Sequence, residues 1–158
     1  KRRSSLATIV GAVPGALPPV IGWTAAHGTV AVGGLVLFGI VFFWQMPHFL
    51  AIAWMHRDDY AKAGMPLLPV IEPSGRSTGR QAVLYAAATI PVSLLPTLLG
   101  LAGPRYLITA IVLGAMVLWL SFEFAATRTH VAARRLFFAT IIYLPLILGA
   151  LVLDHAWR

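Results

Sequence analysis

Long apolar stretches alternate with short polar ones along this chain. A membrane-spanning helix requires about 20 mostly apolar residues. Five segments approach or reach that length: residues 6–23, 30–54, 81–101, 106–126 and 136–153. Polar positions gather mainly in residues 55–80, which we predict to form a loop. The pattern therefore predicts an all-α fold, a polytopic bundle of transmembrane helices belonging to a single domain over residues 1–158.

The composition agrees with a membrane protein and excludes several kinds of site. Only 11 % of the residues are charged and 59 % are hydrophobic, whereas a soluble domain carries about 25 % charged residues. The absence of cysteine excludes disulfides and thiolate sites. The net charge of +7 could suggest nucleic acid, but the bases fall in short clusters between apolar runs. We therefore expect a lipid bilayer as partner and no nucleic acid.

The positions of the basic residues predict an orientation. Loops on the cytoplasmic side of a membrane carry an excess of Lys and Arg. With a cytoplasmic N-terminus, Arg105 and Arg158 are the bases outside, and the inside set is Lys1, Arg2, Arg3, Arg57, Lys62, Arg76, Arg80, Arg128, Arg134 and Arg135. This asymmetry places residues 55–80 on the cytoplasmic side.

The first apolar segment has features that a simple anchor lacks. Pro14, Pro18 and Pro19 interrupt helical hydrogen bonds, and Gly11 and Gly15 form a G-x-x-x-G pair that permits close helix contact. Two interpretations stay open: a kinked packing helix, or one wall of a cavity.

A mostly polar stripe is predicted along the second segment. A continuous helix brings Gln45, His48, Ile52, His56 and Asp59 onto one face, running from membrane depth to the end of the segment. Polar side chains at membrane depth usually face a bundle interior or a pathway. For the histidine at position 48 we weigh two roles equally: a hydrogen bond to a backbone carbonyl freed by the neighbouring proline kink, or contact with a substrate such as haem.

The most charged stretch of the chain follows directly. Asp58 and Asp59 suit Mg²⁺, which binds one or two carboxylates together with phosphate oxygens. Asp58 stands four residues before Lys62, where an ion pair is the simpler explanation, so we favour Asp59 as the metal ligand. Basic residues nearby suit the remaining charge of a diphosphate: Lys1, Arg2, Arg57 and Lys62. The residues thus predict a membrane enzyme or carrier that handles an anionic headgroup with an apolar tail.

Four runs of sequence resemble a known family. They are K-R-R-S-S-L at 1–6, V-G-A-V-P-G-A-L-P-P-V-I-G-W at 10–23, W-Q-M-P-H-F-L-A-I-A-W at 44–54 and R-D-D-Y-A-K-A-G-M-P-L-L-P at 57–69. These runs are similar to the protoheme IX farnesyltransferase (haem O synthase) branch of the UbiA-type intramembrane prenyltransferases. The resemblance covers essentially the whole chain, although the later helices match only in general character.

The resemblance implies an activity and a set of site residues. It implies transfer of a farnesyl group from farnesyl diphosphate to a vinyl group of haem b, with Mg²⁺ as cofactor, in the bacterial inner membrane. Asp58 and Asp59 correspond to the family's second aspartate motif, as metal ligands and catalytic residues. The diphosphate-binding residues are Lys1, Arg2, Arg57 and Lys62, and the haem contacts are Gln45, His48 and His56. A haem A synthase is an expected partner.

Two departures from the family pattern bear on activity. The wider family often spaces its second motif as D-x-x-x-D, where this chain has His56 and Tyr60 at the ends. The resemblance also implies a bundle of about nine helices, so that an N-terminal half with the first aspartate motif precedes Lys1. The 158 residues alone are therefore expected to be inactive. The alternatives are a UbiA-type enzyme with another aromatic acceptor, half of a secondary transporter, and a passive haem-binding subunit.

Overall fold

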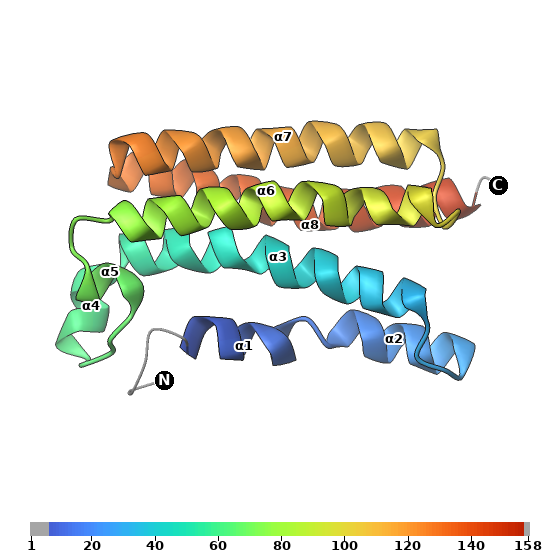
Figure 1. The fold of residues 1–158 in the computed structure, drawn as a ribbon, viewed down its shortest axis with the longest axis horizontal. Coiled ribbons are helices and arrows are strands. Elements are labelled where there is room, and N and C mark those ends of the chain that lie inside the picture. The colour runs from blue at the N-terminus through green and yellow to red at the C-terminus, as the bar shows by residue number, and fades with distance from the viewer. Residues whose placement is uncertain (1–6, 157–158) are drawn as a thin grey trace.

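The computed structural model describes residues 7–156, and the side chains of residues 10–154 (Figure 1). This part of the chain is built from helices and contains no strand, so the all-α prediction is confirmed. The helices are α1 (Ala7–Gly15), α2 (Pro18–His27), α3 (Val32–Met55), α4 (Arg57–Lys62), α5 (Leu68–Ile71), α6 (Arg76–Leu98), α7 (Pro104–Thr127) and α8 (His130–Ala156).

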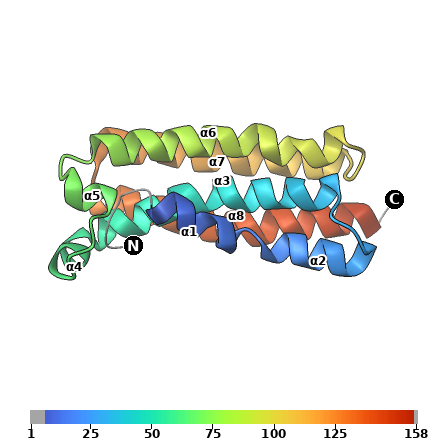
Figure 2. The same ribbon diagram turned by 60° about the horizontal axis from the view of Figure 1, so that its bottom comes forward.

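Four of these helices, α3, α6, α7 and α8, are long and apolar enough to cross a membrane. They lie side by side and form the body of the bundle (Figures 1 and 2). The short helices α4 and α5 lie together at one end, between α3 and α6. The predicted polytopic helical bundle is therefore present.

The first predicted segment is not one helix. The hydropathy pattern predicts a continuous segment over residues 6–23, but the structure divides it between α1 and α2. Pro18 and Pro19 have no N–H group to donate to the carbonyls four residues earlier, so the helix stops at Gly15 and restarts at Pro18. The two short helices follow each other along the length of α3 and lie at the edge of the bundle (Figure 1).

Residues 55–80 are more ordered than the predicted loop. They hold α4, α5 and the first turn of α6, which begins at Arg76 rather than at residue 81. The carboxylate of Glu72 accepts hydrogen bonds from the backbone N–H groups of Arg76, at 3.2 Å, and Ser77, at 2.8 Å. This capping satisfies N–H groups that have no partner within the helix, and it extends α6 beyond its apolar part.

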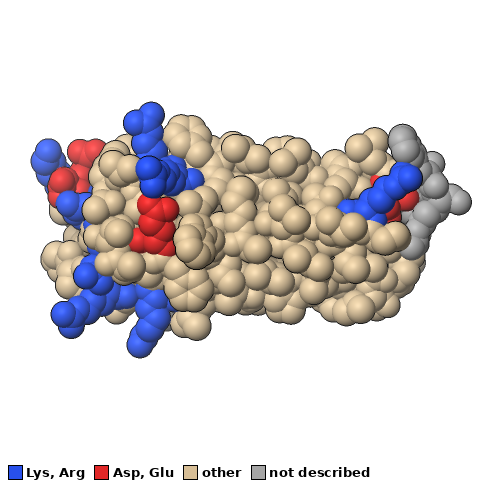
Figure 3. All heavy atoms as spheres, turned by 90° about the horizontal axis from the view of Figure 1, so that it is seen from above, with Lys and Arg blue, Asp and Glu red and all other residues tan. Residues whose placement is uncertain are grey.

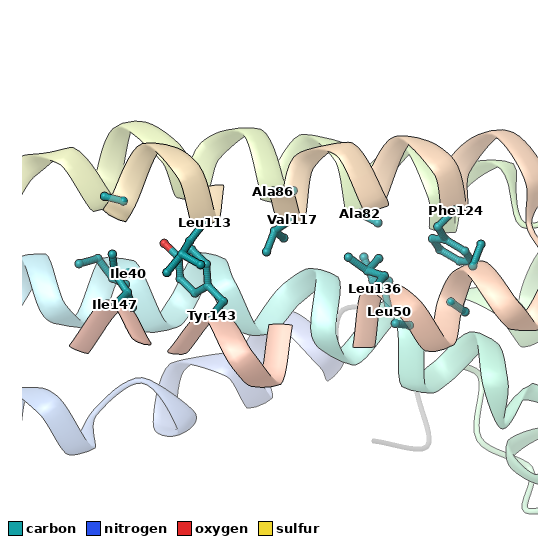
Figure 4. Packing of buried hydrophobic residues seen from close by; sticks show 14 of the residues in the cluster. Ile40, Leu50, Ala82, Ala86, Leu113, Val117, Phe124, Leu136, Tyr143 and Ile147 are labelled. Atoms are coloured by element: carbon teal, nitrogen blue, oxygen red, sulfur yellow. The ribbon is translucent and has the colours of Figure 1, made fainter. Parts of the chain in front are cut away.

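The core lies among the four long helices. Figure 4 shows Ile40, Leu113, Tyr143 and Ile147 among the side chains that fill the space between the α6–α7 pair and the α3–α8 pair. Helix α2, by contrast, has no buried residue. The outer surface is largely apolar, with residues such as Trp119 exposed, as expected where lipid replaces water.

Charged side chains gather at the two ends of the bundle (Figure 3). One end carries α4, the start of α6, the end of α7 and the start of α8, and the basic residues on these segments are Arg57, Lys62, Arg76, Arg80, Arg128, Arg134 and Arg135. The opposite end carries Arg105 near the start of α7. The structure therefore brings the described members of the predicted inside set to one end.

Candidate functional site

The helix that was predicted to carry the polar stripe is interrupted at His56. The angular count from Gln45 to Asp59 assumes a continuous helix, but α3 stops at Met55 and α4 restarts at Arg57. His56, between them, has φ −110° and ψ 21°, outside helical geometry. The assumption of one continuous helix is therefore wrong, and the shared face of Asp59 and His48 stays a prediction.

Gln45 holds α1 against α3. Its side chain is only 3 % exposed, and its Nε2 donates a hydrogen bond of 2.7 Å to the carbonyl oxygen of Ala12. Gly15 makes room for this contact, since a Cβ there would lie 2.6 Å from Oε1 of Gln45. The amide thus bridges two helices, and its predicted role in haem contact stays a prediction.

His48 lies between two aromatic rings. Its ring centroid is 5.3 Å from that of Trp44 and 5.0 Å from that of Phe137, with interplanar angles of 19° and 22°. Nδ1 lies 2.9 Å from the hydroxyl of Thr140 on α8. The indole Nε1 of Trp44 donates to the backbone carbonyl of Thr140 at 2.6 Å. The partner of His48 is thus a side chain on another helix. Of the two roles weighed for His48, the bond to a carbonyl freed by Pro47 is not what the structure shows, and the substrate contact stays a prediction.

The two acids lie in the first turn of α4, at the basic end of the bundle. The side chains of Asp58 and Asp59 are 83 % and 73 % exposed. Asp59 Oδ2 lies 3.7 Å from His56 Nδ1, and Asp58 Oδ1 lies 3.9 Å from Arg57 Nε. The expected pair between Asp58 and Lys62 is therefore replaced by a weak contact with Arg57.

The predicted magnesium site at these carboxylates stays a prediction. Within the described side chains, no three of Asp, Glu, His and Cys come close enough together to hold a metal ion. Mg²⁺, however, takes one or two protein carboxylates and completes its shell with phosphate oxygens and water. Asp58 and Asp59 are adjacent, exposed and only weakly paired, so they can supply that number of ligands.

The predicted diphosphate-binding bases differ in how firmly the structure holds them. Arg57 is anchored: its guanidinium lies 4.7 Å from the centroid of the Trp54 ring, and Nη1 donates to the Trp54 carbonyl at 3.2 Å. Lys62 is exposed and forms no ion pair with the described residues. Lys1 and Arg2 lie outside the described residues. Arg57 and Lys62 are thus held on the same short helix as the two acids.

Sequence reasoning missed the residues that α8 contributes. Thr140 and Phe137 lie in an apolar helix with no motif, about 90 residues beyond His48, and their role depends on α8 packing against α3. It also missed Asp154, which is buried and accepts a hydrogen bond from the N–H of Gly103 at the start of α7. A cavity of about 280 Å³ lies beside this contact, at the end of the bundle opposite α4.

Comparison with known proteins gives one consistent result. The sequence model of the UbiA prenyltransferase family matches residues 1–144. A protein named protoheme IX farnesyltransferase from Solibacter usitatus is 51 % identical over 155 residues, which cover 98 % of this chain and 53 % of the relative. Proteins of the same name from Opitutus terrae and Koribacter versatilis are 50 % and 45 % identical, each over 98 % of this chain.

The chain spans about half the length of the curated relatives it matches, 53 % and 52 % of the first two. No solved structure matches it.

Proposed function

The chain belongs to the UbiA prenyltransferase family, and from this we propose that the polypeptide containing it transfers a farnesyl group from farnesyl diphosphate to a vinyl group of protoheme IX. The acceptor is taken from the relatives' name, protoheme IX farnesyltransferase. The product of this reaction is haem O, and the proposed location is the inner membrane of a bacterium.

One observation carries the proposal: a stacked aromatic cluster lies along α3 below an acidic turn. His48, Trp44 and Phe137 form the cluster. His48 stands seven residues before Met55, the last residue of α3, and at 1.5 Å per residue that places it about 10 Å below the helix end. A porphyrin beside this cluster and a diphosphate at the turn would meet between these two levels.

The acidic turn is suited to the diphosphate. Asp58 and Asp59 would hold Mg²⁺, which supplies charge neutralisation for the leaving diphosphate. Arg57 would add charge-assisted hydrogen bonds to the same group. The guanidinium of Arg57 already stacks on Trp54 near the two acids. It therefore does not have to become ordered when the diphosphate binds.

The chemistry that this arrangement would support is a substitution at carbon. The bond between farnesyl C1 and oxygen breaks, and its electron pair leaves with the diphosphate. The vinyl carbon of the haem bonds to C1, and water adds to the resulting cation with loss of a proton. The apolar bundle excludes water from the first step, which protects the allylic cation.

We propose that the α4 end faces the cytoplasm. The seven described bases at that end, against Arg105 at the other, follow the excess of Lys and Arg that cytoplasmic loops carry. Both substrates would then enter from the cytoplasmic side of the bilayer, with the farnesyl tail and porphyrin in the apolar region.

The test uses the whole polypeptide that contains these residues, reconstituted in lipid nanodiscs. It is incubated with farnesyl diphosphate and either haem b or 4-hydroxybenzoate, with Mg²⁺ or with EDTA, and products are identified by mass. We expect a farnesylated, hydrated haem only with haem b and Mg²⁺. A product from 4-hydroxybenzoate alone would assign the chain to another branch of the family, and no prenyl product from either acceptor would contradict a transferase role.

A further inference from the structure

The hydrogen bonds around Thr140 determine which nitrogen of His48 carries the proton. The hydroxyl of Thr140 lies 2.6 Å from the carbonyl oxygen of Phe137 and 2.9 Å from Nδ1 of His48. A carbonyl only accepts, and a threonine hydroxyl has a single proton. That proton goes to Phe137, so Nδ1 of His48 must be the donor to Thr140. The neutral imidazole then carries its lone pair on Nε2.

Nε2 of His48 has no hydrogen-bond partner among the described residues. His48 is only half-buried by the described part of the chain. The stacked rings of Trp44 and Phe137 restrict rotation of the imidazole about its side-chain bonds. A fixed ring, a defined tautomer and an unused lone pair are together the features of a metal-ligating histidine.

We propose that Nε2 of His48 is the axial ligand of the iron of the haem substrate, and that Thr140 is the positioning residue that fixes its tautomer. This rests on the proposed function for the identity of the substrate. An imidazole nitrogen is a common axial ligand of haem iron. Ligating histidines usually donate their second N–H to an acceptor, which orients the ring and raises its basicity. Thr140 supplies that acceptor.

The other described histidines lack this combination. His27, His56 and His130 are exposed. Nδ1 of His27 lies 3.1 Å from the carbonyl of Trp23 in α2, which packs beside the start of α3, far from α4. His56 lies beside Asp59 at the end of α3. Of these four histidines, only His48 lies at membrane depth, has a hydrogen-bond partner for Nδ1 on another helix, and stacks against two aromatic rings.

Iron ligation by His48 also orients the substrate for reaction. The vinyl groups lie on the rim of the porphyrin, and iron ligation fixes the centre of the ring at the level of His48. A vinyl group directed along α3 toward α4 then approaches the diphosphate end of the farnesyl chain. The inferred ligand thus serves to hold the acceptor, and it takes no proton and forms no covalent bond to carbon.

The test is spectroscopic and uses the whole polypeptide in nanodiscs with ferric haem b and no farnesyl diphosphate. We expect the absorption and electron paramagnetic resonance spectra of imidazole-ligated haem in the unmodified protein. His48→Gln should lose that signature and bind haem about tenfold to a hundredfold more weakly, and Thr140→Val should weaken binding about tenfold. Thr140→Ser, which keeps the hydroxyl, should bind haem as the unmodified protein does, and His130→Gln is the matched control that should leave the spectra unchanged.

Loss of fold in the His48 variant is separated from loss of the ligand by chemical rescue. Free imidazole added to His48→Gly should restore the ligated spectrum. Identical spectra in the unmodified protein and in His48→Gln would overturn the inference, as would a signature that follows His56 instead. Farnesylated haem formed by a protein without an imidazole signature would leave the proposed function standing and remove this inference. An imidazole-ligated haem with no prenyl product would leave this inference standing and contradict the proposed function.

Discussion

The side-chain amide of Gln45 on α3 donates to the backbone carbonyl of Ala12 on α1 across 2.7 Å. The same carbonyl accepts from the N–H of Ala16 at 3.1 Å, just before the helix breaks. Gly15 leaves room for the amide, because any side chain there would overlap it. A polar residue that the sequence suggests as a substrate contact thus ties the broken pair α1–α2 to the bundle.

We predict that Gln45→Leu lowers the free energy of unfolding by about 1 kcal/mol, the usual size of a side-chain hydrogen bond between membrane helices. Ala12 keeps its bond to Ala16, so no buried carbonyl is left without a partner. Equilibrium unfolding in mixed micelles containing SDS measures the change. Gln81→Leu is the matched control, because Gln81 has no side-chain hydrogen bond among the described residues; an equal loss in both variants would contradict the role of the Ala12 contact.

Gly79 sets the distance between α6 and α7. A Cβ at this position would lie 2.7 Å from the backbone Cα of Ala125, and a backbone atom cannot move aside as a side chain can. We predict that Gly79→Ala costs about 1–3 kcal/mol, the usual range for overpacking, in the same unfolding assay. Gly149→Ala in α8 serves as control, because a Cβ at Gly149 would meet nothing within 4 Å. Equal stability of the two variants would show that α6 and α7 are not closely packed here.

Ser93 of α6 connects three helices in the interior of the bundle. Its hydroxyl lies 2.5 Å from the hydroxyl of Tyr143 on α8, and its carbonyl accepts from the hydroxyl of Tyr106 on α7 at 2.8 Å. We predict that Tyr143→Phe lowers the free energy of unfolding by about 1 kcal/mol, since each such bond is worth that much in a membrane. Tyr85→Phe is the control, because the hydroxyl of Tyr85 has no hydrogen bond within the described residues. An equal or larger loss of unfolding free energy in the control would show that the bond between Tyr143 and Ser93 does not stabilise the bundle.

Much of the bundle is predictable from hydropathy. The expected segments 30–54 and 106–126 correspond within about two residues to α3 and α7, because the change from apolar to polar residues marks the membrane boundary. The start of α8 is less predictable. It begins at His130 rather than at residue 136, and its first turns carry Arg135, which pairs with Glu123 of α7 at 2.7 Å. Charges that pair across helices extend a helix beyond its apolar part.

The candidate site is predictable only in part. Asp58, Asp59 and His48 stand out in the sequence itself, because acids and histidines are rare in such an apolar chain. The break at His56 carries no proline or glycine, so helical spacing continues through it without a visible interruption. The link from His48 to Thr140 depends on which helix packs against α3, and a single sequence does not contain that information.

In the proposed farnesyl transfer, the acidic turn of α4 handles the diphosphate. The most direct measurement is the rate of farnesylated haem formation by the whole polypeptide with Asp58 and Asp59 both changed to Asn, and Glu123→Gln, an acid at the same end of the bundle, is the control. We predict that the double variant loses at least about a hundredfold in rate, the scale of removing a charge-stabilising group, while still binding haem, and that the control keeps its activity. Product formation at the unmodified rate by the double variant would contradict the account.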